Sequence, residues 1–180
     1  MTFSIVREAV LSEGRAAVLA RSAFLLGIAL VSPMFFSQPV TGVFVNMALV
    51  LSALLFGFRK ESVLVAVVPS LVALSRGQLS VAFLPIVPFI MAGNLVLVAT
   101  FHLVYRKYGD FLLAAGLGSF LKAGFLFSVG SVFSMTLFAG SPLAERVVAM
   151  FGWLQLSTAL AGSAVALLVA RLSGYAGEGR

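Results

Sequence analysis

The sequence predicts an all-α integral membrane protein, a six-transmembrane-helix bundle that forms one membrane domain over residues 1–180. Of the 180 residues, 61% are hydrophobic and only 10% are charged. Soluble globular domains carry about 25% charged residues, and a soluble chain of this length has too little interior to hide so much apolar surface. We therefore expect lipid to be the solvent for most of the chain.

Six apolar segments are the expected helices. They cover residues 16–36, 42–58, 62–75, 84–105, 111–139 and 147–171. The third segment is short, since a crossing takes about 20 residues. It is either a full crossing or a short buried or re-entrant helix, and the charge pattern favours the crossing.

Prolines mark several of the expected helix ends. The sequence Ser37-Gln-Pro39 is expected to end the first helix, because proline lacks an N–H donor and disfavours helix before it. Pro85 falls at the start of the fourth helix, and Pro142 separates the fifth from the sixth. Charged residues precede the first segment and no small-residue cleavage pattern follows it, so we expect a retained helix rather than a signal peptide.

The basic residues indicate how the helices are oriented. With six crossings, the side that holds both termini carries Arg7, Arg15, Arg21, Arg59, Lys60, Arg106, Lys107, Arg171 and Arg180. The opposite side carries only Arg76 and Arg146. Cytoplasmic loops are enriched in Lys and Arg, so both termini are expected in the cytoplasm. The basic residues form no single patch, which argues against nucleic acid as a partner.

Polar side chains inside the apolar segments are candidates for function, because they are costly in lipid. The expected topology brings Asn46, Asn94 and Gln155 to the outer half of the membrane and Lys122 near its middle. Two further polar residues, Gln38 and Thr41, fall in the expected outer turn between the first two helices and would close over the same region. This distribution predicts a substrate pocket that opens to the outside.

Lys122 gives the most specific prediction among these polar residues. No Asp or Glu lies within any predicted span, so the lysine has no acidic partner in the membrane. An anionic ligand would resolve that imbalance. The alternative is that Lys122 snorkels toward water or donates to backbone carbonyls.

The other residues predicted to contact substrate also have alternative, purely structural roles. Asn46, Asn94 and Gln155 would otherwise make hydrogen bonds between helices. The aromatic rings of Phe125 and Trp153 are candidates for stacking on a flat substrate, the alternative being contact with lipid.

Small residues recur on one face of the first helix. Ala16, Ala20, Ala23 and Gly27 follow one another at spacings of four, three and four residues. Such faces let helices approach closely in lipid, where the hydrophobic effect does not drive association. The face serves either internal packing or docking onto a second membrane protein.

The sequence lacks the residues that several classes of activity require. It has no cysteine and one histidine, so no metal site and no cofactor is expected. It has no phosphate-binding loop of the G-x-x-x-x-G-K-[ST] type and no catalytic triad or paired intramembrane carboxylates, so an enzyme is not expected. Proton-coupled carriers use titratable carboxylates within the membrane, and none is present. Energy for transport would therefore come from a partner.

Five stretches together carry a resemblance to a known family. They are QPVTGVFVN at 38–46, VPSLVALSRG at 68–77, PIVPFIMAGN at 85–94, SFLKAGFLF at 119–127 and WLQLSTALAG at 153–162. Their order and spacing, with six spans in about 180 residues, resemble the S component of energy-coupling-factor (ECF) transporters. The resemblance extends from the first helix to the last.

The resemblance implies a substrate-binding membrane subunit of an ATP-driven importer for a vitamin or related micronutrient. Such subunits lie in the prokaryotic cytoplasmic membrane and capture substrate near the outer face. They dock through the first helix onto a transmembrane coupling protein that carries two ATPase subunits. The family's Ala-x-x-x-Ala docking motif corresponds here to Ala16 and Ala20, with Ala23 and Gly27 as a looser continuation.

The expected function is thus capture of a small anionic vitamin-like molecule near the outer face. In this hypothesis Lys122 supplies charge, while Asn94 and Gln155 orient the substrate. Two alternatives remain open at the level of sequence. One is a self-sufficient facilitator or channel, which would transport without ATPases, and the other is a ligand-free assembly subunit.

Overall fold

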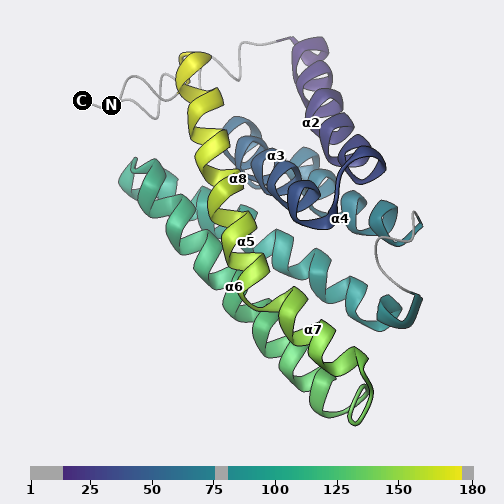
Figure 1. The fold of residues 1–180 in the computed structure, drawn as a ribbon. Helices are drawn as coiled ribbons and strands as arrows, with labels where there is room; N and C mark the ends of the chain where they lie inside the picture. Colours follow the sequence, from purple (N-terminus) through teal and green to yellow (C-terminus); the bar gives the residue numbers. More distant parts are fainter. Residues whose placement is uncertain (1–13, 76–80, 176–180) are drawn as a thin grey trace.

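The chain folds into a bundle of α-helices (Figure 1), and the computed structural model describes residues 14–75 and 81–175. No β-strand occurs in these two ranges. The long helices reverse direction from one to the next, whereas α8 continues the course of α7. The helical segments are α2 (Arg15–Phe35), α3 (Gln38–Phe56), α4 (Lys60–Ser75), the 3₁₀ helix η1 (Val81–Ile86), α5 (Val87–Tyr108), α6 (Phe111–Met135), α7 (Leu143–Phe151) and α8 (Trp153–Leu172).

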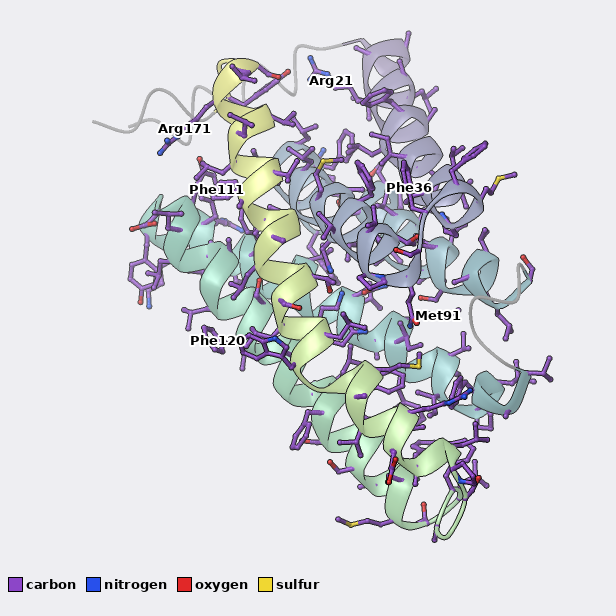
Figure 2. The ribbon with its side chains drawn as sticks, viewed as in Figure 1. Arg21, Phe36, Met91, Phe111, Phe120 and Arg171 are labelled. Atoms are coloured by element: carbon purple, nitrogen blue, oxygen red, sulfur yellow. The ribbon has the colours of Figure 1, made fainter. Side chains whose placement is uncertain are left out.

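Five helical segments are long and apolar enough to cross a membrane. They are Ala16–Phe35, Gln38–Phe56, Val81–Tyr108, Phe111–Met135 and Leu143–Leu172. Large apolar side chains such as Leu19, Phe24, Leu103 and Phe120 are exposed on the outside of the bundle (Figure 2). Surface of this kind fits the acyl chains of a bilayer rather than water. The fold is therefore that of a multi-pass membrane protein.

The segment expected to be the third of six crossings is α4, which has 16 residues and contains Pro69. At 1.5 Å per residue such a helix is roughly 24 Å long, less than the roughly 30 Å hydrocarbon core. The described residues thus carry five helices of spanning length, and a sixth crossing stays a prediction. Arg76, which the charge pattern assigned to the far side, lies outside the described residues.

The structure corrects the expected turn between the first two helices. Only Phe36 and Ser37 connect α2 to α3, and Gln38 to Thr41 form the first turn of α3. Pro39 stands in that first turn, where the N–H that proline lacks has no partner inside the helix. Proline therefore starts the second helix, and its beginning moves from residue 42 to Gln38.

The last two segments also differ from the expected ones. The fifth helix ends at Met135, so residues 136–139 leave the helix that was expected to include them. The sixth segment is two helices, α7 and α8, which meet at Gly152. A Cβ atom at Gly152 would lie 2.8 Å from the Val148 carbonyl oxygen, so this tight junction needs a glycine.

Glycine also brings helices together inside the bundle. A Cβ atom at Gly162 of α8 would lie 2.6 Å from the Val43 carbonyl oxygen and 2.7 Å from Cβ of Asn46, both on α3. Likewise, a Cβ atom at Gly118 of α6 would lie 3.2 Å from the Leu97 carbonyl oxygen on α5. Close backbone contact of this kind drives helix association in lipid.

The two ends of the bundle differ in charge. Six basic residues of the described chain lie at the end where α2 begins and α8 finishes, and we call it the basic end: Arg21, Arg59, Lys60, Arg106, Lys107 and Arg171. Figure 2 places Arg21 and Arg171 at this end. At the opposite end, Arg146 on α7 is the basic residue that the structure describes.

Candidate functional site

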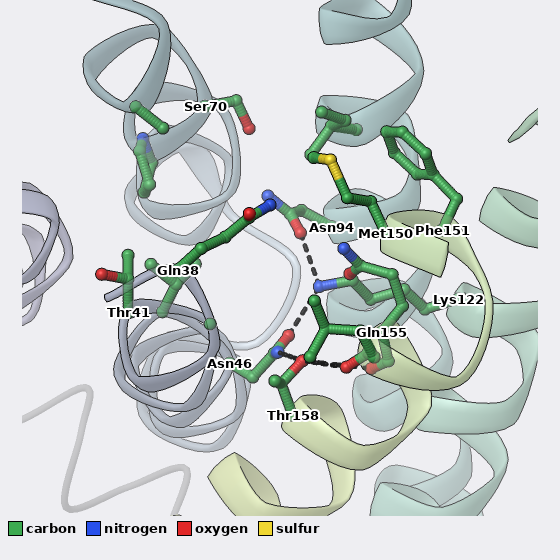
Figure 3. A pocket seen from close by; sticks show the side chains of 16 residues that line it. Gln38, Thr41, Asn46, Ser70, Asn94, Lys122, Met150, Phe151, Gln155 and Thr158 are labelled. Carbon is green, nitrogen blue, oxygen red and sulfur yellow. Dashed lines mark hydrogen bonds between the residues drawn. The ribbon is translucent and has the colours of Figure 1, made fainter. Parts of the chain in front are cut away.

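A cavity of about 100 Å³ lies among six helices, in their halves away from the basic end (Figure 3). It sits where the two apolar clusters of the core meet, since Val45 packs with one cluster and Ile90 and Phe151 pack with the other. Its walls are Gln38, Thr41, Gly42, Val45, Asn46, Pro69, Ser70, Ala73, Ile90, Asn94, Lys122, Met150, Phe151, Leu154, Gln155 and Thr158.

Lys122 is the centre of the polar part of this cavity. Its side chain is 2% exposed, and its Nζ donates to Oδ1 of Asn46 at 2.6 Å and to Oδ1 of Asn94 at 2.7 Å. Both amides therefore turn their oxygens toward the lysine. None of the described residues that line the cavity is acidic, so the hydrogen-bond partners of Lys122 among them are neutral oxygens.

The side-chain nitrogens of Asn46 and Asn94 point away from Lys122 and make hydrogen bonds of their own. Asn46 Nδ2 lies 3.4 Å from Oγ1 of Thr158, whose hydroxyl donates to the Leu154 carbonyl at 2.8 Å. Asn94 Nδ2 donates to the Ala66 carbonyl oxygen at 2.8 Å. A chain of hydrogen bonds thus joins five helices in the order α8, α3, α6, α5 and α4. Figure 3 shows the bonds of Lys122 to Asn46 and Asn94.

The contact with α4 has a local cause in the sequence. Pro69 lies inside α4 and has no N–H to donate to the carbonyl one turn earlier. The neighbouring carbonyl of Ala66 is the one that accepts from Asn94. In lipid, a proline is tolerated when a neighbouring helix satisfies the carbonyls it disturbs.

Three other polar side chains of the cavity have no hydrogen-bond partner in the part of the chain that the structure describes. They are Gln38 on α3, Ser70 on α4 and Gln155 on α8. Ser70 is only 5% exposed, although its hydroxyl is unpaired. In Figure 3, the amide ends of Gln38 and Gln155 point into the cavity from opposite sides. These groups are free to bind a guest or water.

Thr41 takes a different part from the one its sequence position indicated. It lines the cavity, but its hydroxyl is 3.3 Å from the carbonyl oxygens of both Ser32 and Phe36. Those bonds tie the start of α3 to the end of α2. Thr41 therefore stabilises the corner between the two helices rather than offering a free donor.

Neither aromatic residue expected at the pocket lines the cavity. Trp153 is 77% exposed on the outside of α8, and Phe125 packs in the apolar cluster around Phe151 and Leu126. The helix faces explain the correction, since Gln155 and Thr158 turn inward on α8 and Trp153 then faces away. The aromatic wall of the cavity is Phe151, at the end of α7.

Sequence reasoning missed several cavity residues. Ser70 drew no attention because a serine in an apolar segment is common, although its position beside Pro69 was a usable signal. Thr158 accepts a hydrogen bond from Asn46 and also lines the cavity. Met150 and Phe151 gave no signal, because apolar residues look alike along a membrane segment.

The small-residue face of α2 is not covered by the rest of the described bundle. Ala16, Ala20 and Ala23 are exposed, and no atom lies within 4 Å of a Cβ atom built on Gly27. In the most apolar stretch of each helix, only 22% of the residues of α2 are buried, compared with 56% of those of α3. Packing among the described residues therefore does not account for this face.

The described acidic and histidine side chains lie apart from one another. Within residues 14–75 and 81–175, no three His, Cys, Asp or Glu side chains come together to hold an ion. His102, at the basic end, packs against Gly57, where a Cβ atom would lie 2.8 Å from the imidazole. The imidazole thus has a packing contact at the opposite end from the cavity.

Comparison of the chain with family models, with curated proteins and with solved structures finds no match. The cavity, the charge distribution and the uncovered face of α2 are therefore the observations on which a function is proposed.

Proposed function

We propose that this protein is the substrate-capture subunit of an ATP-driven importer of the ECF type in the cell membrane. It binds a small anionic vitamin or micronutrient near the outer face and delivers it together with a separate transmembrane coupling protein and two ATPase subunits. The single observation that carries the proposal is Lys122, held between two amide oxygens in an internal cavity.

The argument for an anionic guest is electrostatic. An ammonium removed from water loses several kcal/mol of solvation unless an opposite charge replaces it. Asn46 and Asn94 supply dipoles but no charge, and the cavity wall contains no carboxylate. An anion that enters the cavity supplies the missing charge.

The direction of capture follows from the two ends of the bundle. Lys and Arg residues gather on the cytoplasmic side of membrane proteins, so we assign the basic end to the cytoplasm. The cavity lies in the opposite halves of the helices and therefore faces the exterior. A site on that side is suited to collecting a substrate from outside the cell.

Delivery needs an energy source outside this chain. The sequence has no nucleotide-binding loop, and the cavity has no carboxylate for proton coupling. The uncovered small-residue face of α2 supports docking of a second membrane protein, because such faces allow close helix contact. We assign that face to the coupling protein.

Mass spectrometry of small molecules that co-purify with the full chain in mild detergent tests the capture function. We expect the wild-type protein to retain a specific small molecule, and Lys122→Met to lose it while its thermal unfolding stays cooperative. Ser119→Ala is the matched control, since this hydroxyl lies one turn away on α6, is fully buried, has no partner and does not line the cavity. Equal retention by the wild type and Lys122→Met would exclude the cavity as the site.

A further inference from the structure

The polar groups around the cavity fall into two sets, according to whether they make hydrogen bonds to other described protein groups. Asn46, Asn94 and Thr158 each donate a hydrogen bond to another protein group, as described above. Gln38, Ser70 and Gln155 have no partner among the described residues. The first set holds Lys122 in place, and the second set is available to a guest.

The available groups are rich in donors. Each glutamine amide carries two N–H donors, and the serine hydroxyl carries one. An ammonium has three N–H donors, and Lys122 uses two of them on Asn46 and Asn94. One N–H of Lys122 therefore remains for the guest, next to the donors of Gln38, Ser70 and Gln155. A guest must supply several acceptors at one point to use them together.

The charge on the wall limits the charge of the guest. Lys122 is the one charged side chain among the residues that line the cavity. A single cation balances a single negative charge, whereas a phosphate dianion would bring an excess charge into a low-dielectric site. The wall therefore fits a monoanion with two acceptor oxygens, which is a carboxylate.

The size of the cavity limits how much of the guest is enclosed. Its volume is about 100 Å³. A cavity of roughly 150 Å³ is needed to hold a benzene ring, and whole-ligand pockets span roughly 300–1,000 Å³. In this conformation the space fits a carboxylate with the first carbons attached to it. Ile90, Met150 and Leu154 provide an apolar wall for those carbons.

We propose that the cavity is the head-group site for a monocarboxylate: Lys122 supplies the charge, and the donors of Gln38, Ser70 and Gln155 select a carboxylate over a neutral amide. This assignment rests on the proposed capture function and names its substrate class. Gln38 belongs to the first turn of α3 and Gln155 to the first turn of α8. The partial positive charge of both helix N-termini favours the same anion.

Matched probes test the assignment on the full-length protein in lipid nanodiscs. Acetate, propionate and benzoate are titrated by calorimetry against acetamide, propionamide and benzamide, with inorganic phosphate as a separate anion. We expect at least one carboxylate to bind roughly tenfold or more tightly than its amide and than phosphate, as a charge-assisted hydrogen bond to a buried ammonium requires. Amides that bind as well as their acids, a preference for phosphate, or no binding of any acid would overturn the assignment.

Variants separate the selecting donors from the frame that holds Lys122. Gln155→Glu and Gln38→Glu place a negative charge beside the guest with little change in shape, and we expect each to weaken carboxylate binding by roughly tenfold or more. Gln155→Leu should reduce the preference for the acid over its amide. Ser119→Ala should bind as the wild type does. Carboxylate binding that survives both glutamate substitutions would remove Gln38 and Gln155 from the site.

The two proposals fail in different ways. If a small molecule co-purifies with the wild type in a Lys122-dependent manner but is not a carboxylate, the capture function stands and the head-group assignment falls. If nothing co-purifies and no probe binds, both fall. If the protein binds a carboxylate but no coupling protein or ATPase co-purifies with it from its native membrane, the head-group site stands and the importer falls.

Discussion

Lys122 Nζ lies 2.6 Å from Oδ1 of Asn46, although 76 residues separate the two along the chain. The same nitrogen lies 2.7 Å from Oδ1 of Asn94. Three helices thus meet at one buried cation whose partners are both uncharged. This arrangement leaves positive charge in the interior that no acidic side chain among the cavity-lining residues neutralises.

Removing an amide from this cluster should cost more than removing the lysine. Asn46→Leu and Asn94→Leu each leave the ammonium with one acceptor, and we expect each to lower the free energy of unfolding by about 2–4 kcal/mol. Lys122→Met deletes the charge and leaves two neutral amide oxygens without this donor, so we expect a smaller loss of about 1–2 kcal/mol. Thermal or denaturant unfolding in detergent measures these differences.

The double variants complete that test. Combining Lys122→Met with Asn94→Leu should recover part of the stability lost in Asn94→Leu, because no charge is then left unpaired. Ser119→Ala should be close to neutral and should add independently to Asn94→Leu. Additive losses for Lys122 and Asn94 would contradict the idea that the two amides exist to hold the lysine.

Gly162 sets the distance between α3 and α8. A methyl group there would meet backbone and Cβ atoms of α3, which have no room to move aside. We expect Gly162→Ala to destabilise the protein by at least about 2 kcal/mol and to loosen the contact of Asn46 with Thr158. Gly116→Ala on α6 is the control, since no atom lies within 4 Å of its added carbon. Equal stability of the two variants would show that this crossing is not close-packed.

The orientation of the bundle can be measured directly, because the chain has no cysteine. Arg146→Cys and Arg59→Cys each place one exposed thiol, at the end beyond the cavity and at the basic end respectively. In intact cells, a membrane-impermeant maleimide should label Arg146→Cys and should reach Arg59→Cys only after permeabilisation. The reverse pattern would put the cavity on the cytoplasmic side and contradict capture from outside.

Larger side chains on the small-residue face of α2 should weaken association with the proposed partner subunits without affecting folding. Ala20→Leu and Gly27→Leu add side chains where the structure has open space. If the proposed complex forms, we expect the wild type to co-purify with ATPase subunits and both variants to lose them, with unchanged unfolding temperatures and substrate binding. Ala164→Leu adds the same bulk at an exposed position of α8 and should keep the ATPases. Loss of the ATPases in all three variants would argue against a specific surface.

Trp153 should report on lipid and not on the substrate. It is the single tryptophan of the chain and is 77% exposed at the start of α8. Lipids brominated along the acyl chain should therefore quench its fluorescence, and Trp153→Phe should keep the co-purifying ligand. A tryptophan shielded from brominated lipid but quenched by substrate would restore the stacking role first expected from the sequence.

The amino-acid sequence alone determined that this chain is helical and apolar enough for a membrane. The reason is local, since lipid demands long apolar runs whose backbone groups pair within the same segment. The sequence also indicated that Lys122 lacks an acidic partner within the predicted spans, which needs only a search for Asp and Glu. The resemblance to ECF transporters and the vitamin-like substrate stay predictions.

Only the tertiary structure decided which polar side chains meet. Helix rotation is set by glycine contacts between segments far apart in the chain, such as Gly162 with α3, and these contacts turn Gln155 inward while Trp153 faces out. The same is true of Gln38, which belongs to a helix rather than a turn, and of Ser70, which becomes a cavity residue beside Pro69. Periodicity along one segment cannot fix these faces, because an apolar helix in lipid shows no polar side to mark them.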